Sequence, residues 1–237
     1  MYIKRFEMLM DSETDKAAVL LPKEFKRLLR EASWGRNGKR NLAIIWMSFG
    51  SALRVTEIAN LKVKDLVKKD GSLKEEYRLP AAYTKNGESR MAYMLEPEHQ
   101  QAIRNYLDWR KEKKRRTTNS EEYGGHQPDS PLFLARGVAG FTFLSKEYTK
   151  TDGTVVEYKV CSSLQQLISD MIKRVGVKGA SSHSGRRTFG TRLADRGIAI
   201  EYIRYFLGHK TDDQTMEYID ANKQRTRKIL KNVYGEF

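Results

Sequence analysis

Apolar residues recur at helical spacing along much of this chain, and this periodicity constrains the fold more than any other feature. Each of the following segments places apolar side chains three or four residues apart: 23–32, 39–53, 97–110 and 162–177. Gly50 and Gly176 stand where the second and fourth of these helices are expected to end. After Gly50, Thr56 is expected to cap a short helix that runs through Leu61. The sequence therefore predicts one main domain that is mostly helical.

Two stretches interrupt the helical pattern. Between residues 61 and 95, short apolar runs are broken by turn residues, and Asn86-Gly87 is a strong signal for a two-residue hairpin. A second hairpin is expected within residues 141–160, with its turn at Asp152-Gly153. The predicted fold class is therefore mainly α with a small antiparallel β-sheet (α+β).

The charge balance points to a polyanionic partner. The chain has 44 Lys and Arg against 30 Asp and Glu, a net charge of +14, which favours nucleic acid, although ribosomal or tail-like non-specific binding gives the same balance. No apolar run is long enough to span a bilayer and no secretory signal opens the chain, so we expect an intracellular protein without a membrane partner. Cys161 is the only cysteine, which excludes an intrachain disulfide and a zinc site of paired thiolates.

The region from residue 181 onward carries candidate site residues. Ser181 or Ser182 is expected to cap a helix that contains His183 and Arg186 and is ended by Gly197. Because residues three apart on a helix are neighbours, the imidazole and the guanidinium are expected on one face.

A second group of candidates follows closely. A short helix over residues 200–207 is expected to end at Gly208, just before His209. Thr211 to Gln214 fits a capping box, so Tyr218 is predicted to lie on the helix that follows.

These residue types suit chemistry at a phosphodiester. A guanidinium such as that of Arg186 stabilises negative charge on phosphate oxygens with two hydrogen bonds, and never has to give up its proton. His183 and His209 can handle protons or donate to the phosphate, and the phenol of Tyr218 can attack phosphorus once deprotonated. Taken singly, each residue is more commonly structural or solvated. Their ordered combination is what favours a site.

That order resembles the catalytic domain of the tyrosine recombinases, the phage-integrase family, in which a His-x-x-Arg box, a Gly-His box and a nucleophilic tyrosine follow one another. Upstream, SALRVTEIANLKVKDL is similar to the family's first arginine box, with Arg54 and Glu57. YTKNGESRMAYML is similar to its β-hairpin lysine segment, with Lys85 beside the turn. The resemblance covers roughly residues 22 to 220.

The resemblance implies a helical domain with a small β-sheet that cleaves and rejoins double-stranded DNA without a metal or another cofactor. It assigns the following roles: Arg54 and Arg186 clamp the phosphate, His183 and His209 assist proton movement, Tyr218 attacks, Lys85 protonates the departing 5′ hydroxyl, and Glu57 orients the buried arginines and histidine. Two alternatives stay open on the residues alone. Arg54 could instead form an ordinary ion pair with Glu57, and Lys85 could be a solvated residue at a turn.

The expected organisation is an N-terminal lead-in or linker over residues 1–21, a catalytic domain over 22–220 and a C-terminal helical tail over 221–237. Relatives carry a separate N-terminal helical domain, so this chain is either an excised fragment or a naturally short enzyme. The tail either packs on its own domain or docks into a neighbouring protomer of a tetramer on DNA. Arg187 stands where many relatives have a second histidine, a change expected to be tolerated.

The predicted function is therefore that of a site-specific recombinase or integrase that works through a covalent 3′-phosphotyrosine. A type IB topoisomerase shares that chemistry and is the first alternative. A non-catalytic DNA-binding regulator of the same fold is the second.

Overall fold

The computed structural model describes residues 17–84, 87–149 and 153–219. The helices in these ranges are α2 (Pro22–Ser33), α3 (Gly38–Phe49), α4 (Val55–Asn60), α5 (Val63–Leu66), α6 (Pro97–Glu112), α7 (Ser162–Arg174), α8 (Ser184–Asp195), α9 (Ile200–Leu207) and α10 (Asp212–Met216). The strands are β1 (Glu76–Leu79), β2 (Arg90–Tyr93), β3 (Leu134–Arg136), β4 (Ala139–Gly140), β5 (Leu144–Thr149) and β6 (Val155–Val160), and two 3₁₀ turns are η1 (Ala81–Tyr83) and η2 (Glu122–Gly125). Within the described ranges the strands form three two-stranded antiparallel sheets, so the predicted mainly α fold is confirmed.

Several predicted helix ends are confirmed. Gly50 is the C-cap of α3. Gly176, Gly197 and Gly208 follow α7, α8 and α9 with φ of 78°, 80° and 61°. Glycine enters this left-handed region without a steric penalty, so each residue lets the chain leave its helix and turn.

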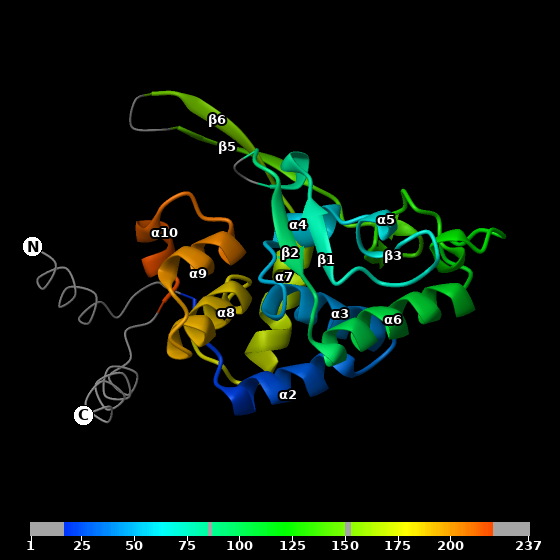
Figure 1. Ribbon diagram of the computed structural model, residues 1–237, viewed down its shortest axis with the longest axis horizontal. Coiled ribbons are helices and arrows are strands. Elements are labelled where there is room, and N and C mark those ends of the chain that lie inside the picture. Colours follow the sequence, from blue (N-terminus) through cyan, green and yellow to red (C-terminus); the bar gives the residue numbers. More distant parts are fainter. Residues whose placement is uncertain (1–16, 85–86, 150–152, 220–237) are drawn as a thin grey trace, which may run out of the picture.

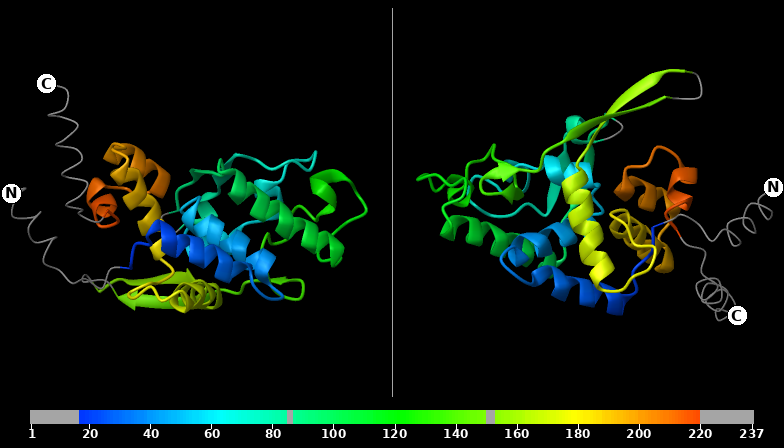
Figure 2. Two further views of the ribbon diagram at one scale, coloured as in Figure 1. Left: turned by 90° about the horizontal axis from the view of Figure 1, so that it is seen from below. Right: turned by 180° about the vertical axis from the view of Figure 1, so that it is seen from behind.

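The main core is built around α3. This helix is apolar on almost every side, and its Ile44, Ile45 and Met47 are fully buried, which is the pattern of a helix surrounded by protein. It packs against α2, α6 and α8, and α7 packs against α2 and α4. Figure 2 shows α7 behind α3, on the side opposite the β1–β2 hairpin.

The helices α8, α9 and α10 gather at one end of the molecule, and α6 and β3 extend toward the other (Figure 1). Ala52, Ile203 and Leu207 form a small second core there. Gly185 lets α8 approach α3 closely, because a Cβ at this position would stand 2.2 Å from the hydroxyl of Ser48. This close contact fixes where the residues that follow on α8 are placed.

The chain before α2 is attached to this end of the domain. The backbone N–H of Ala18 donates to the Gly179 carbonyl at 2.9 Å, and that of Leu20 donates to Thr188 Oγ1 at 3.0 Å. The guanidinium of Arg187 donates to the Ala17 carbonyl. Arg187 is therefore directed at the lead-in rather than at the residues that contact Arg186.

The first hairpin differs from its prediction. The strands β1 and β2 pair antiparallel, but Leu79 pairs with Arg90, so the connection runs over residues 80–89 and is no two-residue turn. It begins with the 3₁₀ turn η1, directly after Pro80. Gly87 does take a left-handed φ of 68°, while Asn86 lies outside the described residues.

The second predicted hairpin is confirmed as an antiparallel pair. Leu144 of β5 pairs with Val160 of β6, and Thr149 pairs with Val155. The hairpin extends away from the helical body (Figure 1). Asp152 of the predicted turn lies outside the described residues. No helix in the described ranges is long and apolar enough to cross a membrane.

Candidate active site

Glu57, in the first turn of α4, is the anion around which the site is arranged. Its side chain is fully buried. It accepts hydrogen bonds from the backbone N–H of Arg54 at 2.7 Å, from Arg54 Nη1 at 3.1 Å and from Arg90 Nη2 at 2.6 Å. Burial alone would raise the pKa of this carboxyl, but the charges of Arg90, Arg186 and Arg54 lower it to about 2. Glu57 is therefore ionised and held in place at neutral pH.

The same bond corrects the predicted start of α4. Arg54, not Thr56, is the N-cap residue, and α4 begins at Val55. The carboxylate of Glu57, at the third helical position, accepts from the N–H of the N-cap residue, as the acidic residue of a capping box does. This places Arg54 at the point where the chain enters α4, with its guanidinium beside the carboxylate.

Arg186, on α8, is the most deeply buried cation of the site, with 1% exposure. Its Nη1 donates to the Ala52 carbonyl and its Nη2 to the Leu207 carbonyl, both at 2.5 Å. Its Nε has no hydrogen-bond partner among the described residues. Burial, followed by the positive charge of Arg54, lowers the pKa of Arg186 to about 9, so it stays charged at neutral pH.

His209 links this arginine to α10. Its Nε2 lies 3.2 Å from Arg186 Nη2, and since a guanidinium only donates, Nε2 accepts and the proton is on Nδ1. Nδ1 then donates to Thr215 Oγ1 at 3.2 Å, and that hydroxyl donates to the Thr211 carbonyl at 3.3 Å. Burial and the nearby charges of Arg186 and other arginines lower the pKa of His209 to about 3, so the imidazole is neutral.

Tyr218 packs against both of these groups. Its ring centroid lies 4.7 Å from that of His209 and 5.7 Å from Cζ of Arg186. The prediction that it lies on the helix is wrong. The helix α10 ends at Met216, and Tyr218 follows in a turn in which its N–H donates to the Thr215 carbonyl at 2.9 Å. The turn brings the phenol back over the arginine.

The predicted capping box at α10 is only half present. The Thr211 hydroxyl accepts from the Gln214 N–H at 3.3 Å, as expected. The Gln214 side chain, however, accepts from the N–H of Lys210 at 3.1 Å and not from that of Thr211.

His183 takes a different place from the one predicted. It is itself the N-cap of α8, which begins at Ser184, and the Ser181 hydroxyl accepts from its N–H at 3.2 Å. His183 is exposed whereas Arg186, one turn on, is buried. The structure thus brings Arg54, Glu57, Arg186, His209 and Tyr218 together, with His183 at the exposed helix start. Lys85 lies outside the described residues.

Arg90, on β2, is a site residue that the sequence reasoning missed. Its Nε and Nη2 donate to Glu57 and its Nη1 donates to the Phe206 carbonyl at 3.0 Å. The available signal was indirect: a buried carboxylate needs cations on more than one side, and Arg90 lies within the segment already singled out for Lys85. Residue spacing alone does not identify which basic residue of this segment pairs with Glu57.

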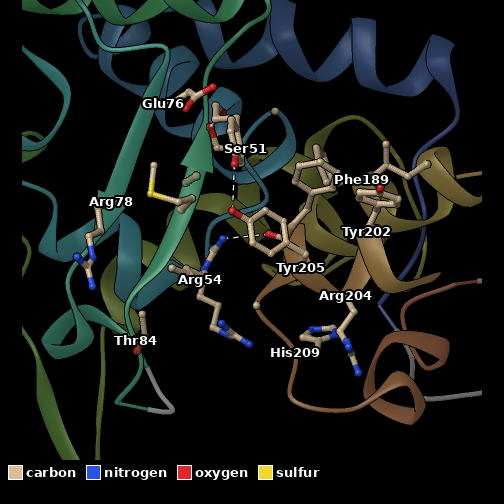
Figure 3. A pocket seen from close by; sticks show the side chains of 18 of the residues that line it. Ser51, Arg54, Glu76, Arg78, Thr84, Phe189, Tyr202, Arg204, Tyr205 and His209 are labelled. Atoms are coloured by element: carbon tan, nitrogen blue, oxygen red, sulfur yellow. Dashed lines mark hydrogen bonds between the residues drawn. The ribbon is translucent and has the colours of Figure 1, made fainter. Parts of the chain in front are cut away.

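A groove of about 1670 Å³ opens beside this cluster, between the β1–β2 hairpin and α9. Figure 3 shows Arg78 and Thr84 on the hairpin side and Tyr202, Tyr205 and His209 on the α9 side. Its basic lining residues are Arg54, Arg78, Arg90, Arg196, Arg204 and Lys210. Cations interleaved with aromatic rings match the phosphates and the sugars or bases of a nucleic acid.

The arrangement of cations and a phenol suits phosphoryl chemistry. In the described part of the chain, no group of three or more His, Cys, Asp or Glu side chains is placed to hold a metal ion. The cluster instead offers guanidinium groups, which stabilise the charge that builds up on phosphate oxygens. A phenol lies within reach of them.

Two curated proteins illustrate the sequence similarity. The tyrosine recombinase XerC of Staphylococcus epidermidis is 22% identical over 201 residues, which is 84% of this chain and 55% of XerC. The tyrosine recombinase XerA of Pyrococcus furiosus is 24% identical over 202 residues, 83% of this chain and 57% of XerA. The chain thus spans little more than half the length of these relatives.

Solved structures agree on the fold. A crystal structure of XerA recombinase superposes with a TM-score of 0.65 at 22% identity, covering 94% of this chain and 65% of that one. The XerH site-specific recombinase, in a post-cleavage complex with palindromic difH substrate, gives a TM-score of 0.62 at 18% identity, covering 93% and 54%. The fold is that of a tyrosine recombinase catalytic domain.

The sequence match identifies the family directly. The model of the phage integrase family matches residues 18–225. The chain belongs to this family, as its motifs predicted.

Proposed function

We propose that this chain is the catalytic domain of a site-specific DNA recombinase, which breaks and rejoins DNA strands through a covalent 3′-phosphotyrosine. The observation that carries the proposal is the position of Tyr218, whose ring packs over Arg186 and His209. Glu57 holds two further arginines in place beside them. A tyrosine that only filled the core would not need this number of cations around it.

The reaction follows from these groups. The Tyr218 phenol gives up its proton, for which we propose His183 as the acceptor, and its oxygen attacks phosphorus. The bond from phosphorus to the 5′ oxygen breaks, and the departing 5′ oxygen takes a proton, for which we propose Lys85 as the donor. A 5′ hydroxyl from another strand then attacks the phosphotyrosine and restores the free phenol. One phosphate ester replaces another at each step, so no external energy source is required. Arg54 and Arg186 stabilise the charge on the non-bridging oxygens in both steps, and we assign His183 to proton movement from the start of α8.

The resting geometry requires a movement before attack. Arg54, Arg90 and His209 line the groove, whereas Arg186 and Tyr218 are not among its lining residues. We propose that a DNA phosphate entering the groove displaces the turn that carries Tyr218, while His209 keeps its place in the groove lining. Arg186 Nε, which has no partner in the described residues, is then available to the phosphate.

The remaining parts of the proposal concern organisation. Residues 22–220 make up the proposed catalytic domain, residues 1–21 lead into it, and the domain acts in a tetramer on double-stranded DNA. The predicted tail lies outside the described residues. The protein would act inside the cell, where its DNA substrate is found.

Trapping on a nicked suicide duplex tests the chemistry. The nick makes the fragment with the free 5′ hydroxyl short enough to diffuse away after cleavage. Wild-type protein should therefore accumulate linked to a 3′ phosphate. Tyr218→Phe should form no adduct, and Tyr123→Phe, in η2, should react like wild type. No adduct from wild type on duplexes carrying many candidate sites, or equal adduct from Tyr218→Phe, would contradict the proposal. Plasmid relaxation without strand exchange between two duplexes would favour the topoisomerase alternative.

A further inference from the structure

Arg90 joins three parts of the molecule through one side chain. It begins β2, it forms the ion pair with Glu57 of α4 at 2.6 Å, and it donates to the Phe206 carbonyl in the last turn of α9 at 3.0 Å. Only 9% of its side chain is exposed. A buried arginine with every direction of its fork engaged is a rigid link, because none of these bonds can exchange freely with water.

The carbon stem of Arg90 explains a glycine as well. Gly208 has a left-handed φ of 61°, and a Cβ built on it would stand 2.4 Å from Cδ and 3.1 Å from Nε of Arg90. Gly197 has a similar φ of 80°, but nothing lies within 4 Å of its Cβ position. Conformation alone explains Gly197, whereas Gly208 is required both by its φ and by the passage of Arg90 across it.

Other links between the hairpin and α9 are weaker. Lys210 pairs with Glu88 at 2.9 Å, but both side chains are more than half exposed. The hydroxyls of Tyr93 and Tyr205 meet at 3.1 Å, also at the surface. Exposed pairs of this kind contribute little. The rings of Tyr93 and Phe206 add an edge-to-face contact with centroids 5.6 Å apart, and Arg90 adds a buried, directional polar link between the two sides of the groove.

We propose that Arg90 is a positioning residue. Its side chain lies against Gly208 and pairs with Glu57, and in this way it fixes the loop after α9, which carries His209, relative to Arg54. The catalytic consequence rests on the proposed function, since it concerns groups that would flank one phosphate. The contact itself does not rest on that function. The two parts can therefore be tested by separate measurements.

A double-mutant cycle on stability tests the contact. Urea unfolding is measured for Arg90→Ala, Gly208→Ala, their combination and Gly197→Ala. We expect Gly208→Ala to raise the unfolding equilibrium constant roughly tenfold more than Gly197→Ala does, a further loss of about 1.4 kcal/mol of stability. In the Arg90→Ala background, Gly208→Ala should destabilise the protein no more than Gly197→Ala destabilises wild type. Additive costs in the cycle would show that the two residues do not interact and would overturn the proposal.

Single-turnover adduct formation at saturating DNA tests the catalytic part. We expect Arg90→Ala to slow it roughly ten- to a hundredfold, because neighbouring charges lose their geometry, with DNA affinity changed by less than about threefold. The control Arg174→Ala removes one charge from an exposed pair with Glu31 and should leave the rate unchanged. An Arg90→Ala rate equal to wild type, or a loss confined to affinity, would overturn the role.

Two further variants separate position from charge. Arg90→Lys keeps the charge but not the fork, so it should stay close to Arg90→Ala, and full recovery would overturn positioning in favour of charge alone. Gly208→Ala keeps every polar group and should also slow the reaction, which covers the case that Arg90→Ala does not fold. If wild type forms no adduct, the proposed function fails, while the stability cycle still decides the contact.

Discussion

Buried arginines occur at both ends of this molecule, and their partners differ. Arg110, on α6, is fully buried, and its guanidinium is satisfied by neutral oxygens: the carbonyls of Arg115, Pro131 and Leu132 and the hydroxyl of Ser130. At the other end, Arg54 and Arg90 share the carboxylate of Glu57. Arg186 beside them keeps one Nε without a partner among the described residues.

The difference separates a structural arginine from a candidate catalytic one. Neutral carbonyl and hydroxyl oxygens accept all the hydrogen bonds of Arg110 that are described, so its function is to hold the loop after α6 in place. The arginines around Glu57 border an open groove and a phenol. Burial lowers the pKa of both Arg110 and Arg186, so a lowered pKa does not distinguish the two kinds. The partner and the adjacent groove do.

The largest expected effect is on Arg186. Arg186→Ala should slow adduct formation roughly a hundredfold to a thousandfold, or about 2.7 to 4 kcal/mol, because one donor to the developing charge is lost. Single-turnover rates on the suicide duplex measure this. The adjacent Arg187→Ala is the control, since that guanidinium donates to Ala17. Equal losses in the two variants would remove the distinction between the two kinds of arginine.

The buried carboxylate of Glu57 makes the stability of the protein depend on pH. The pKa of Glu57 falls from 4.5 to about 2 on folding, so its contribution is complete above pH 4.5 and is lost as the pH falls through 2. The loss should reach roughly 3 kcal/mol, because each tenfold change in proton affinity corresponds to about 1.36 kcal/mol. Urea unfolding of wild type and Glu57→Gln between pH 5 and 2 measures it.

The Glu57→Gln variant should be less stable at neutral pH, because its arginines are left without their counter-charge, and its profile should be flatter in acid. Asp70 and Asp129, whose pKa values are lowered by their own hydrogen bonds, titrate in both proteins. Parallel profiles in the two proteins would show that Glu57 does not titrate as described.

At the end of the molecule that holds α6, Arg110→Met should lower the free energy of unfolding by about 2 kcal/mol, because several buried carbonyls lose their donor. The rate of adduct formation per folded molecule should not change. Arg104→Met, which removes an exposed arginine of the same helix, should change stability by no more than about 0.5 kcal/mol. A rate loss in folded Arg110→Met would mean that this end also serves the reaction.

The smallest effect is expected at Thr215, whose hydroxyl accepts from His209 Nδ1 and so orients the imidazole. Thr215→Val should slow adduct formation roughly fivefold, the value of one hydrogen bond of about 1 kcal/mol. Thr188→Val removes another buried hydroxyl, one that accepts from Leu20, and should leave the rate unchanged. A Thr215→Val rate equal to wild type would show that the imidazole is oriented without this bond.

Features that depend on neighbouring residues in the chain were predictable. Helical periodicity located α2, α3, α6 and α7, and glycines marked the ends of α7, α8 and α9. Predictions failed where a distant group decided the local structure. The start of α4 depends on the Glu57 side chain, and the place of Tyr218 depends on a turn that carries its ring back to Arg186.

The sequence by itself determined the family, the helical fold class and five residues that meet at the site, because motif order and helical periodicity are properties of the linear sequence. These residues are Arg54, Glu57, Arg186, His209 and Tyr218. Only the tertiary structure decided which cations share the Glu57 carboxylate and why Gly208 cannot carry a side chain. Arg90 and Phe206 are 116 positions apart, and Arg186 and Ala52 are 134 apart. Contacts over such separations arise from helix packing and from the satisfaction of buried charge, which no local pattern encodes.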